Sequence, residues 1–153
     1  MVNTMREWKT VNNEKDIVYL MNAYSDFHDA CLVEASFKSG YSVDEEQAMH
    51  FPAEKSNALH MIFHSQSYDK PLELIFSGVR KYCIAGWQNY YYCDIMDCYL
   101  KAHNDLITGR DDPLIVWADD SSFNPKKLYD RKILDEPITS FVIADNLKCR
   151  FLL

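Results

Sequence analysis

A chain of 153 residues with 48% hydrophobic content is long enough to form one domain with its own core, and its evenly mixed charges exclude a disordered protein. Ten Tyr, eight Phe and three Trp against four Gly favour β-structure over a helical bundle, because aromatic side chains pack well on pleated strands. The formal charge of -7 excludes nucleic acid as a default partner, since phosphate binding needs clustered Lys and Arg, and it permits a basic protein partner without indicating one.

The cysteines and the N-terminus predict a cytoplasmic protein. Five cysteines form an odd set without a C-x-x-C pair, and the first ten residues lack the apolar core of a signal peptide. Cys93 and Cys98 could belong to a metal site, but no second pair supports one, so we expect buried side chains and no cofactor. No apolar run approaches the roughly 20 residues that cross a bilayer, so we expect no membrane contact.

The first predicted element is a helix at about residues 13–24. Asn13 can cap its N-terminus, and its apolar residues recur at helical spacing, namely Ile17, Leu20, Met21 and Tyr24. Residues 31–38 alternate between polar and apolar side chains and predict a strand. Residues 42–49 contain two adjacent glutamates and predict a loop or a short edge strand.

Residues 59–79 predict a β-hairpin around which the sheet is organised. Apolar residues alternate on both sides of a polar turn at 65–71, namely Leu59, Met61 and Phe63 before it and Leu72, Leu74 and Phe76 after it. We expect Ser77 and Gly78 to break the second strand before another strand at 79–85.

The segment 87–108 fits both a helical face and a strand. Three consecutive tyrosines and the neighbouring strands favour strand. A polar loop at 108–113 then leads into a short apolar strand at 114–118. Residues 121–137 predict a long surface loop or a short helical turn.

The C-terminal residues predict two strands, at 138–144 and 147–151, separated by a turn at Asp145 and Asn146. Together these elements predict an α+β fold in a single domain of residues 1–153. Its body, from about residue 30 to 153, would be a mainly antiparallel β-sheet, curved or sandwich-like, with one N-terminal helix.

No set of residues forms a catalytic constellation, so we expect that the protein is not an enzyme. His60 and His64 would share one face of a helix, but on a strand they lie about 13 Å apart, beyond the reach of one metal ion. His28 and Asp29 favour a structural role at the helix-to-strand junction. The alternative is a small metal-dependent hydrolase centred on these two residues, with Asp119 as a third member.

Aromatic residues in the second half of the chain predict a partner-binding surface. Tyr and Trp are enriched at interfaces, and strand alternation directs some of these rings outward. The candidate surface comprises Trp87, Tyr90, Tyr92, Trp117 and Asp119. Further aspartates could form its rim, namely Asp94, Asp97 and Asp120.

Several short motifs resemble those of a group of small uncharacterised bacterial proteins, some of which are similar to immunity proteins that neutralise a sibling toxin. The motifs are an FHD start, an L-x-F-x-G strand and a late I-x-W strand, and the resemblance covers roughly residues 26 to 150. The positions that carry it are Phe27–Ala30, Glu34, Ser39–Gly40, Val43, Leu72–Leu74, Phe76–Val79 and Ile115–Asp119. His28, Asp29, Gly78 and Trp117 match the group at positions of unknown role, and the resemblance carries over no catalytic residue. Insertions at 103–112 and 121–135 depart from its pattern.

We therefore expect a non-enzymatic binding protein, of bacterial immunity type, that engages a protein through an acidic and aromatic surface. Its partner would be a cognate toxin or a second copy of the chain. The alternatives are the hydrolase centred on His28 and Asp29, and a structural homodimer formed through a sheet edge.

Overall fold

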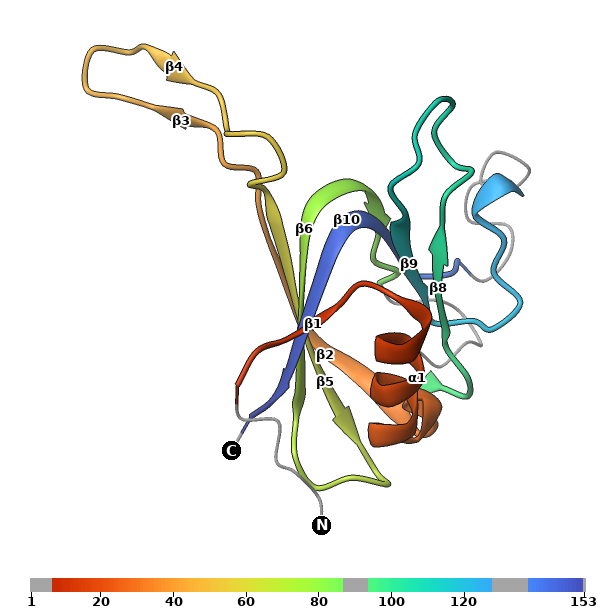
Figure 1. The fold of residues 1–153 in the computed structure, drawn as a ribbon. Helices are drawn as coiled ribbons and strands as arrows, with labels where there is room; N and C mark the ends of the chain where they lie inside the picture. The colour runs from red at the N-terminus through yellow and green to blue at the C-terminus, as the bar shows by residue number, and fades with distance from the viewer. Residues whose placement is uncertain (1–6, 87–93, 128–137, 153) are drawn as a thin grey trace.

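The computed structural model describes residues 7–86, 94–127 and 138–152 (Figure 1). It contains one α-helix, two 3-10 turns and ten strands within these ranges. In chain order they are β1 (Lys9–Val11), α1 (Glu14–Ala23), η1 (Ser25–Phe27), β2 (Ala30–Lys38), β3 (Ser42–Val43), β4 (Met49–His50), β5 (Ala58–Ser65), β6 (Leu72–Cys83), β7 (Asp94–Ile95), β8 (Tyr99–His103), β9 (Leu114–Ala118), η2 (Pro125–Lys127) and β10 (Phe141–Phe151).

Eight strands form one antiparallel sheet that curls into a half-barrel. The strand order is β7-β2-β5-β6-β10-β9-β8, and β1 pairs with β10 outside this path. The two ends of the path, β7 and β8, are consecutive in the chain. Four residue steps join Ile95 to Tyr99 and span at most about 14 Å, so the sheet must bend until its ends approach each other. The predicted curved antiparallel α+β fold is thus confirmed.

The predicted N-terminal helix is confirmed as α1. Asn13 caps it, because its side-chain oxygen accepts a 2.9 Å hydrogen bond from the Asp16 backbone N–H. Ile17 and Leu20 are buried, and they pack into the same core as the inward residues of β5, β6, β9 and β10. Burying this helical face against the sheet supplies the stability that a helix of ten residues lacks alone.

The predicted central hairpin is confirmed: both segments are strands, and the predicted side chains face the core. β5 and β6 pair with Leu59 opposite Phe76, Met61 opposite Leu74 and Phe63 opposite Leu72. All six side chains are at most 1% exposed. Alternation therefore identified the inward face of both strands.

The predicted break at Ser77 and Gly78 is wrong, because β6 continues through both residues to Cys83. Gly78 adopts φ +63°, and a nearby shift in the β6–β10 register leaves Arg80 without a residue opposite it. The strand bends there instead of ending, since β10 pairs with it on both sides of the irregularity.

The predicted turn at Asp145 and Asn146 is also wrong. β10 runs without interruption from Phe141 to Phe151, and β6 pairs with it before and after Asp145. Long-range pairing overrides the turn preference of this dipeptide.

The remaining segments agree in part with expectation where the structure describes them. Strand was favoured for the segment 87–108, and β7 and β8 confirm it at 94–95 and 99–103, whereas 96–98 and 104–108 are not strand and residues 87–93 lie outside the described part. η2 is the short helical turn expected within 121–137, of which residues 128–137 also lie outside it. Among the described ranges, no helix has the length and apolar character that a bilayer crossing requires.

Candidate functional site

The most distinctive surface feature is a hairpin between β2 and β5 that projects away from the body (Figure 1). We call residues 39–56 the arm. Within it β3 and β4 pair antiparallel, with Ser42 opposite His50 and Val43 opposite Met49. The arm forms a separate two-stranded sheet, so the large sheet lends it no strand partner.

Asp44 organises the tip of the arm. Its Oδ1 accepts hydrogen bonds from the backbone N–H groups of Glu46 and Ala48, at 2.9 and 3.0 Å. Its Oδ2 lies 2.7 Å from Nε2 of His50, and its own N–H donates to the carbonyl of Ala48. The hydrogen bond from His50, and after it those from the backbone, hold the pKa of Asp44 below its ordinary value. The turn is therefore fixed by polar contacts within the arm.

Two further contacts fix the base of the arm. The Asn57 side chain donates to the carbonyl of Val79 at 3.0 Å and accepts from its N–H at 2.6 Å, as a neighbouring strand would. On the other side of the base, between β2 and β3, Gly40 has φ +84°, and a Cβ there would lie 2.7 Å from Cβ of Pro52. The base of the arm is thus held beside β6.

The arm has one apolar face and one polar face. Side chains two residues apart on a strand share a face, and so do residues directly opposite each other on paired strands. Tyr41 and Val43 therefore lie on the same face as Met49 and Phe51. These side chains are 56%, 57%, 60% and 75% exposed in chain order, and the rings of Tyr41 and Phe51 are 5.6 Å apart.

The tip of the arm is acidic. The arm contains four acidic residues, Asp44, Glu45, Glu46 and Glu54, and a single Lys or Arg, Lys55. The ammonium of Lys55 lies 3.8 Å from Oδ1 of Asp145, at the body of the protein. The projecting part of the arm is consequently negative.

A groove of about 500 Å³ lies between the base of the arm and β6, lined by residues that include Phe37, Tyr41, Pro52, Lys55, Arg80 and Asp145. The Asp145 side chain is 2% exposed, and Arg80 Nε donates to its Oδ2 at 2.9 Å. Arg110 also donates to Asp145. Burial alone would raise the pKa of Asp145, but the hydrogen bonds from both arginines outweigh it and lower the pKa. Since Glu54 also lines the groove, its carboxylates balance Lys55 and Arg80, and the groove has no surplus charge for an anion.

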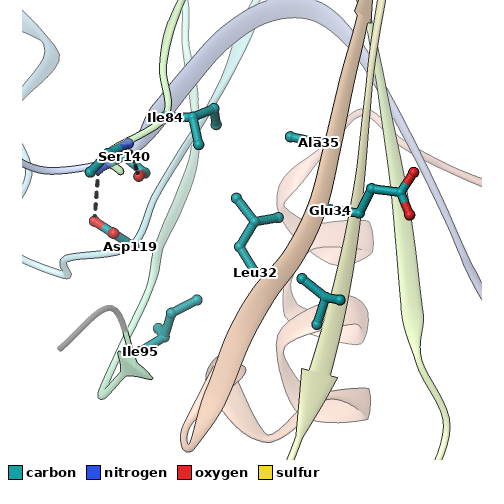
Figure 2. A pocket seen from close by; sticks show the side chains of 9 residues that line it. Leu32, Glu34, Ala35, Ile84, Ile95, Asp119 and Ser140 are labelled. Carbon is teal, nitrogen blue, oxygen red and sulfur yellow. Dashed lines mark hydrogen bonds between the residues drawn. The ribbon is translucent and has the colours of Figure 1, made fainter. Parts of the chain in front are cut away.

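A smaller pocket of about 190 Å³ lies between β2 and the ends of β6, β7 and β9 (Figure 2). Figure 2 shows Leu32 facing Asp119 and Ser140 across it. The Asp119 carboxylate accepts from the Ser140 N–H at 3.1 Å, and the Ser140 hydroxyl accepts from the Ala85 N–H at 2.8 Å. Asp119 therefore fixes the chain entering β10.

His28 and Asp29 join the η1–β2 corner to β7 and do not line the pocket that contains Asp119. His28 Nδ1 lies 2.6 Å from the carbonyl of Met96, and this contact, followed by the charge of Asp29, raises the pKa of His28. Asp29 has φ +58° and donates its N–H to the carbonyl of Ile95 at 2.9 Å. Within the described ranges no three His, Cys, Asp or Glu side chains are grouped so that they could hold a metal ion.

The aromatic surface predicted from the sequence needs correction. Trp117 is 0% exposed, with its ring 5.3 Å from that of Phe63, so its assignment to a binding surface is wrong. Every residue of β9 is buried, because a second apolar cluster covers the opposite face of this strand. Trp87, Tyr90 and Tyr92 lie outside the described residues.

Sequence reasoning missed the apolar face of the arm. The signal was present, because Tyr41 and Val43 alternate before the acidic turn as Met49 and Phe51 do after it. The adjacent glutamates predict a loop or a short edge strand there, and they indicate no functional surface.

Comparisons with protein-family models, with curated proteins and with solved structures find no match to this chain. The resemblance to immunity-type proteins therefore stays a prediction.

Proposed function

We propose that this chain is a non-enzymatic binding protein, of immunity type, that engages a partner protein through the apolar face of the arm. The observation that carries the proposal is the composition of this face, where Tyr41, Val43, Met49 and Phe51 gather on a projecting ribbon. A two-stranded ribbon is marginally stable in water unless a further strand or another element covers its apolar side. A partner protein would supply that cover.

The residue types also suit an interface. Aromatic residues and Met are enriched where proteins meet, and clustered exposed apolar side chains mark contact surfaces. Each of the four residues is more than half exposed to solvent. Covering them would contribute roughly 1 kcal/mol each, because full burial of such a side chain is worth about 1.5–3 kcal/mol.

Contacts within the chain restrict the conformations of the arm without any partner. Its tip is fixed by the contacts of Asp44 and its base by those of Asn57 with Val79. Less conformational entropy is then lost on association, which strengthens binding without new contacts.

Site-specific photocrosslinking tests the proposal. The photoreactive residue p-benzoylphenylalanine would replace Val43 on the apolar face or, as the matched control, the adjacent Ser42 on the polar face, in cells of the native host. We expect one discrete protein adduct from position 43 and little from position 42. No adduct at either position, or equal labelling from both, would contradict the proposal.

The immunity role has its own test. If a toxin gene lies beside this one, its expression should arrest growth and the wild-type chain should restore it. The double variant Val43→Ser/Met49→Ser should protect at least tenfold less well. Protection equal to that of wild type would separate any immunity role from the arm.

A further inference from the structure

We infer that the protein covering the arm is basic, with Lys and Arg side chains around an apolar groove that takes Tyr41, Val43, Met49 and Phe51. This inference rests on the proposed function and names the class of its partner. It follows from the sign and placement of charge along the arm.

Charge on the arm is one-sided. Asp44, Glu45 and Glu46 occupy the tip, where Asp44 contacts His50, and Glu54 lies near the base, whereas Lys55 reaches Asp145 of the body. Each residue of the arm that carries a formal charge, other than Lys55, is therefore negative.

The acidic residues lie at the end that a partner meets first. Glu45 and Glu46 fall in the turn between β3 and β4, at the outer end of the projecting hairpin (Figure 1). Charges in water act over about 8 Å at physiological ionic strength, so charge at a projecting tip acts before the apolar faces touch. A basic partner would be attracted and oriented by this tip, which raises the association rate.

The same charges argue against other occupants of the face. A second copy of the chain would bring another acidic tip and another formal charge of -7. An acidic protein would meet the same repulsion. The apolar face alone would accept any of them, and the acidic tip favours a basic protein.

Crosslinking at position 43 identifies the partner protein. That partner is then purified without the crosslink and mixed with the intact chain, and stopped-flow measurements give the association rate. The test variant is Glu45→Gln/Glu46→Gln, which leaves Asp44 and its turn contacts in place. The control variant, Glu14→Gln/Asp69→Asn, removes two exposed carboxylates outside the arm, one in α1 and one between β5 and β6.

We expect the association rate of wild type to fall about tenfold or more between roughly 20 and 200 mM salt. The tip variant should associate about 3- to 10-fold more slowly at low salt with an unchanged dissociation rate, and the control variant should change less than about twofold. An association rate independent of salt and of the tip variant would overturn the inference. An adduct formed with an acidic protein, or with a second copy of the chain, would overturn it as well.

The outcomes separate the two proposals. If Val43→Ser weakens binding while the tip variant does not, the arm is the docking site and the basic character of the partner is wrong. If position 43 gives no adduct, both proposals fail together.

Discussion

Gly78 and Asp145 meet between β6 and β10 so closely that a Cβ at residue 78 would lie 2.7 Å from Oδ2 of Asp145. Gly78 also has φ +63°, which disfavours every residue with a side chain. The space left by glycine holds a carboxylate that Arg80, Arg110 and Lys55 approach from three segments. This contact therefore ties the sheet to the loop before β9 and to the base of the arm.

Gly78→Ala should lower the free energy of unfolding by about 2–3 kcal/mol, because the methyl group adds a steric clash to backbone strain. Urea denaturation measures this loss. Gly109→Ala is the matched control, since Gly109 also has positive φ, +77°, but a Cβ there would meet no atom within 4 Å beyond its chain neighbours. The control should lose only about 1 kcal/mol. Equal losses in both variants would mean that proximity to Asp145 is unimportant.

Asp145→Asn should lower the free energy of unfolding by about 1–3 kcal/mol at neutral pH, because the arginines lose their buried counter-charge while Arg80 stays half-exposed to water. The lowered pKa of Asp145 gives the pH dependence its sign. Its contribution is present above the unfolded pKa and is lost as pH falls through the folded pKa. The difference between wild type and variant should therefore shrink below about pH 4. A difference that stays constant down to pH 2 would contradict this account.

His28 should titrate above its ordinary pKa in the folded protein, because its ring contacts the carbonyl of Met96 and lies near Asp29. A raised folded pKa means that the contribution is fully present below the unfolded pKa of about 6.5 and is lost as pH rises through the folded value. NMR titration of the imidazole measures the pKa directly. His28→Ala should consequently cost less stability at pH 8 than at pH 5.5. A measured pKa at or below 6.5 would show that the contact with Met96 does not favour the charged ring.

Tyr24→Phe should leave the free energy of unfolding unchanged or raise it by about 1 kcal/mol. Tyr24 is 1% exposed, and its hydroxyl has no hydrogen-bond partner among the described residues. Removing a buried hydroxyl without a partner relieves its desolvation cost, while the ring keeps its contact with Phe27. Chemical denaturation of the two proteins measures the difference. A loss of more than 1 kcal/mol would indicate that the hydroxyl is satisfied.

Local pattern predicted those elements whose faces differ in polarity. The helix at 13–24 and the strands containing Leu59 and Leu74 were correct, because one face of each packs on the core and the other does not. Pattern failed where distant pairing decides the outcome. Asp145 favours a turn by itself, yet β6 holds it in a continuous strand.

The sequence also did not predict that Trp117 is buried or that the arm projects from the sheet. Trp117 could have pointed outward from a strand covered on one face, but a second apolar cluster covers the other face of β9. Tyr41 and Phe51 had no visible reason to stay exposed. Their exposure follows from the arm leaving the sheet, which is a property of the whole topology.

The central claim is that the apolar face of the arm binds a protein. The most direct test is the Kd between the purified partner, identified by crosslinking, and the variant Met49→Ser/Phe51→Ser. Loss of two interface side chains worth roughly 1 kcal/mol each predicts a Kd about 30-fold weaker than that of wild type. Ser42→Ala on the polar face should change the Kd less than about threefold. Equal affinity of wild type and the double variant would contradict the claim.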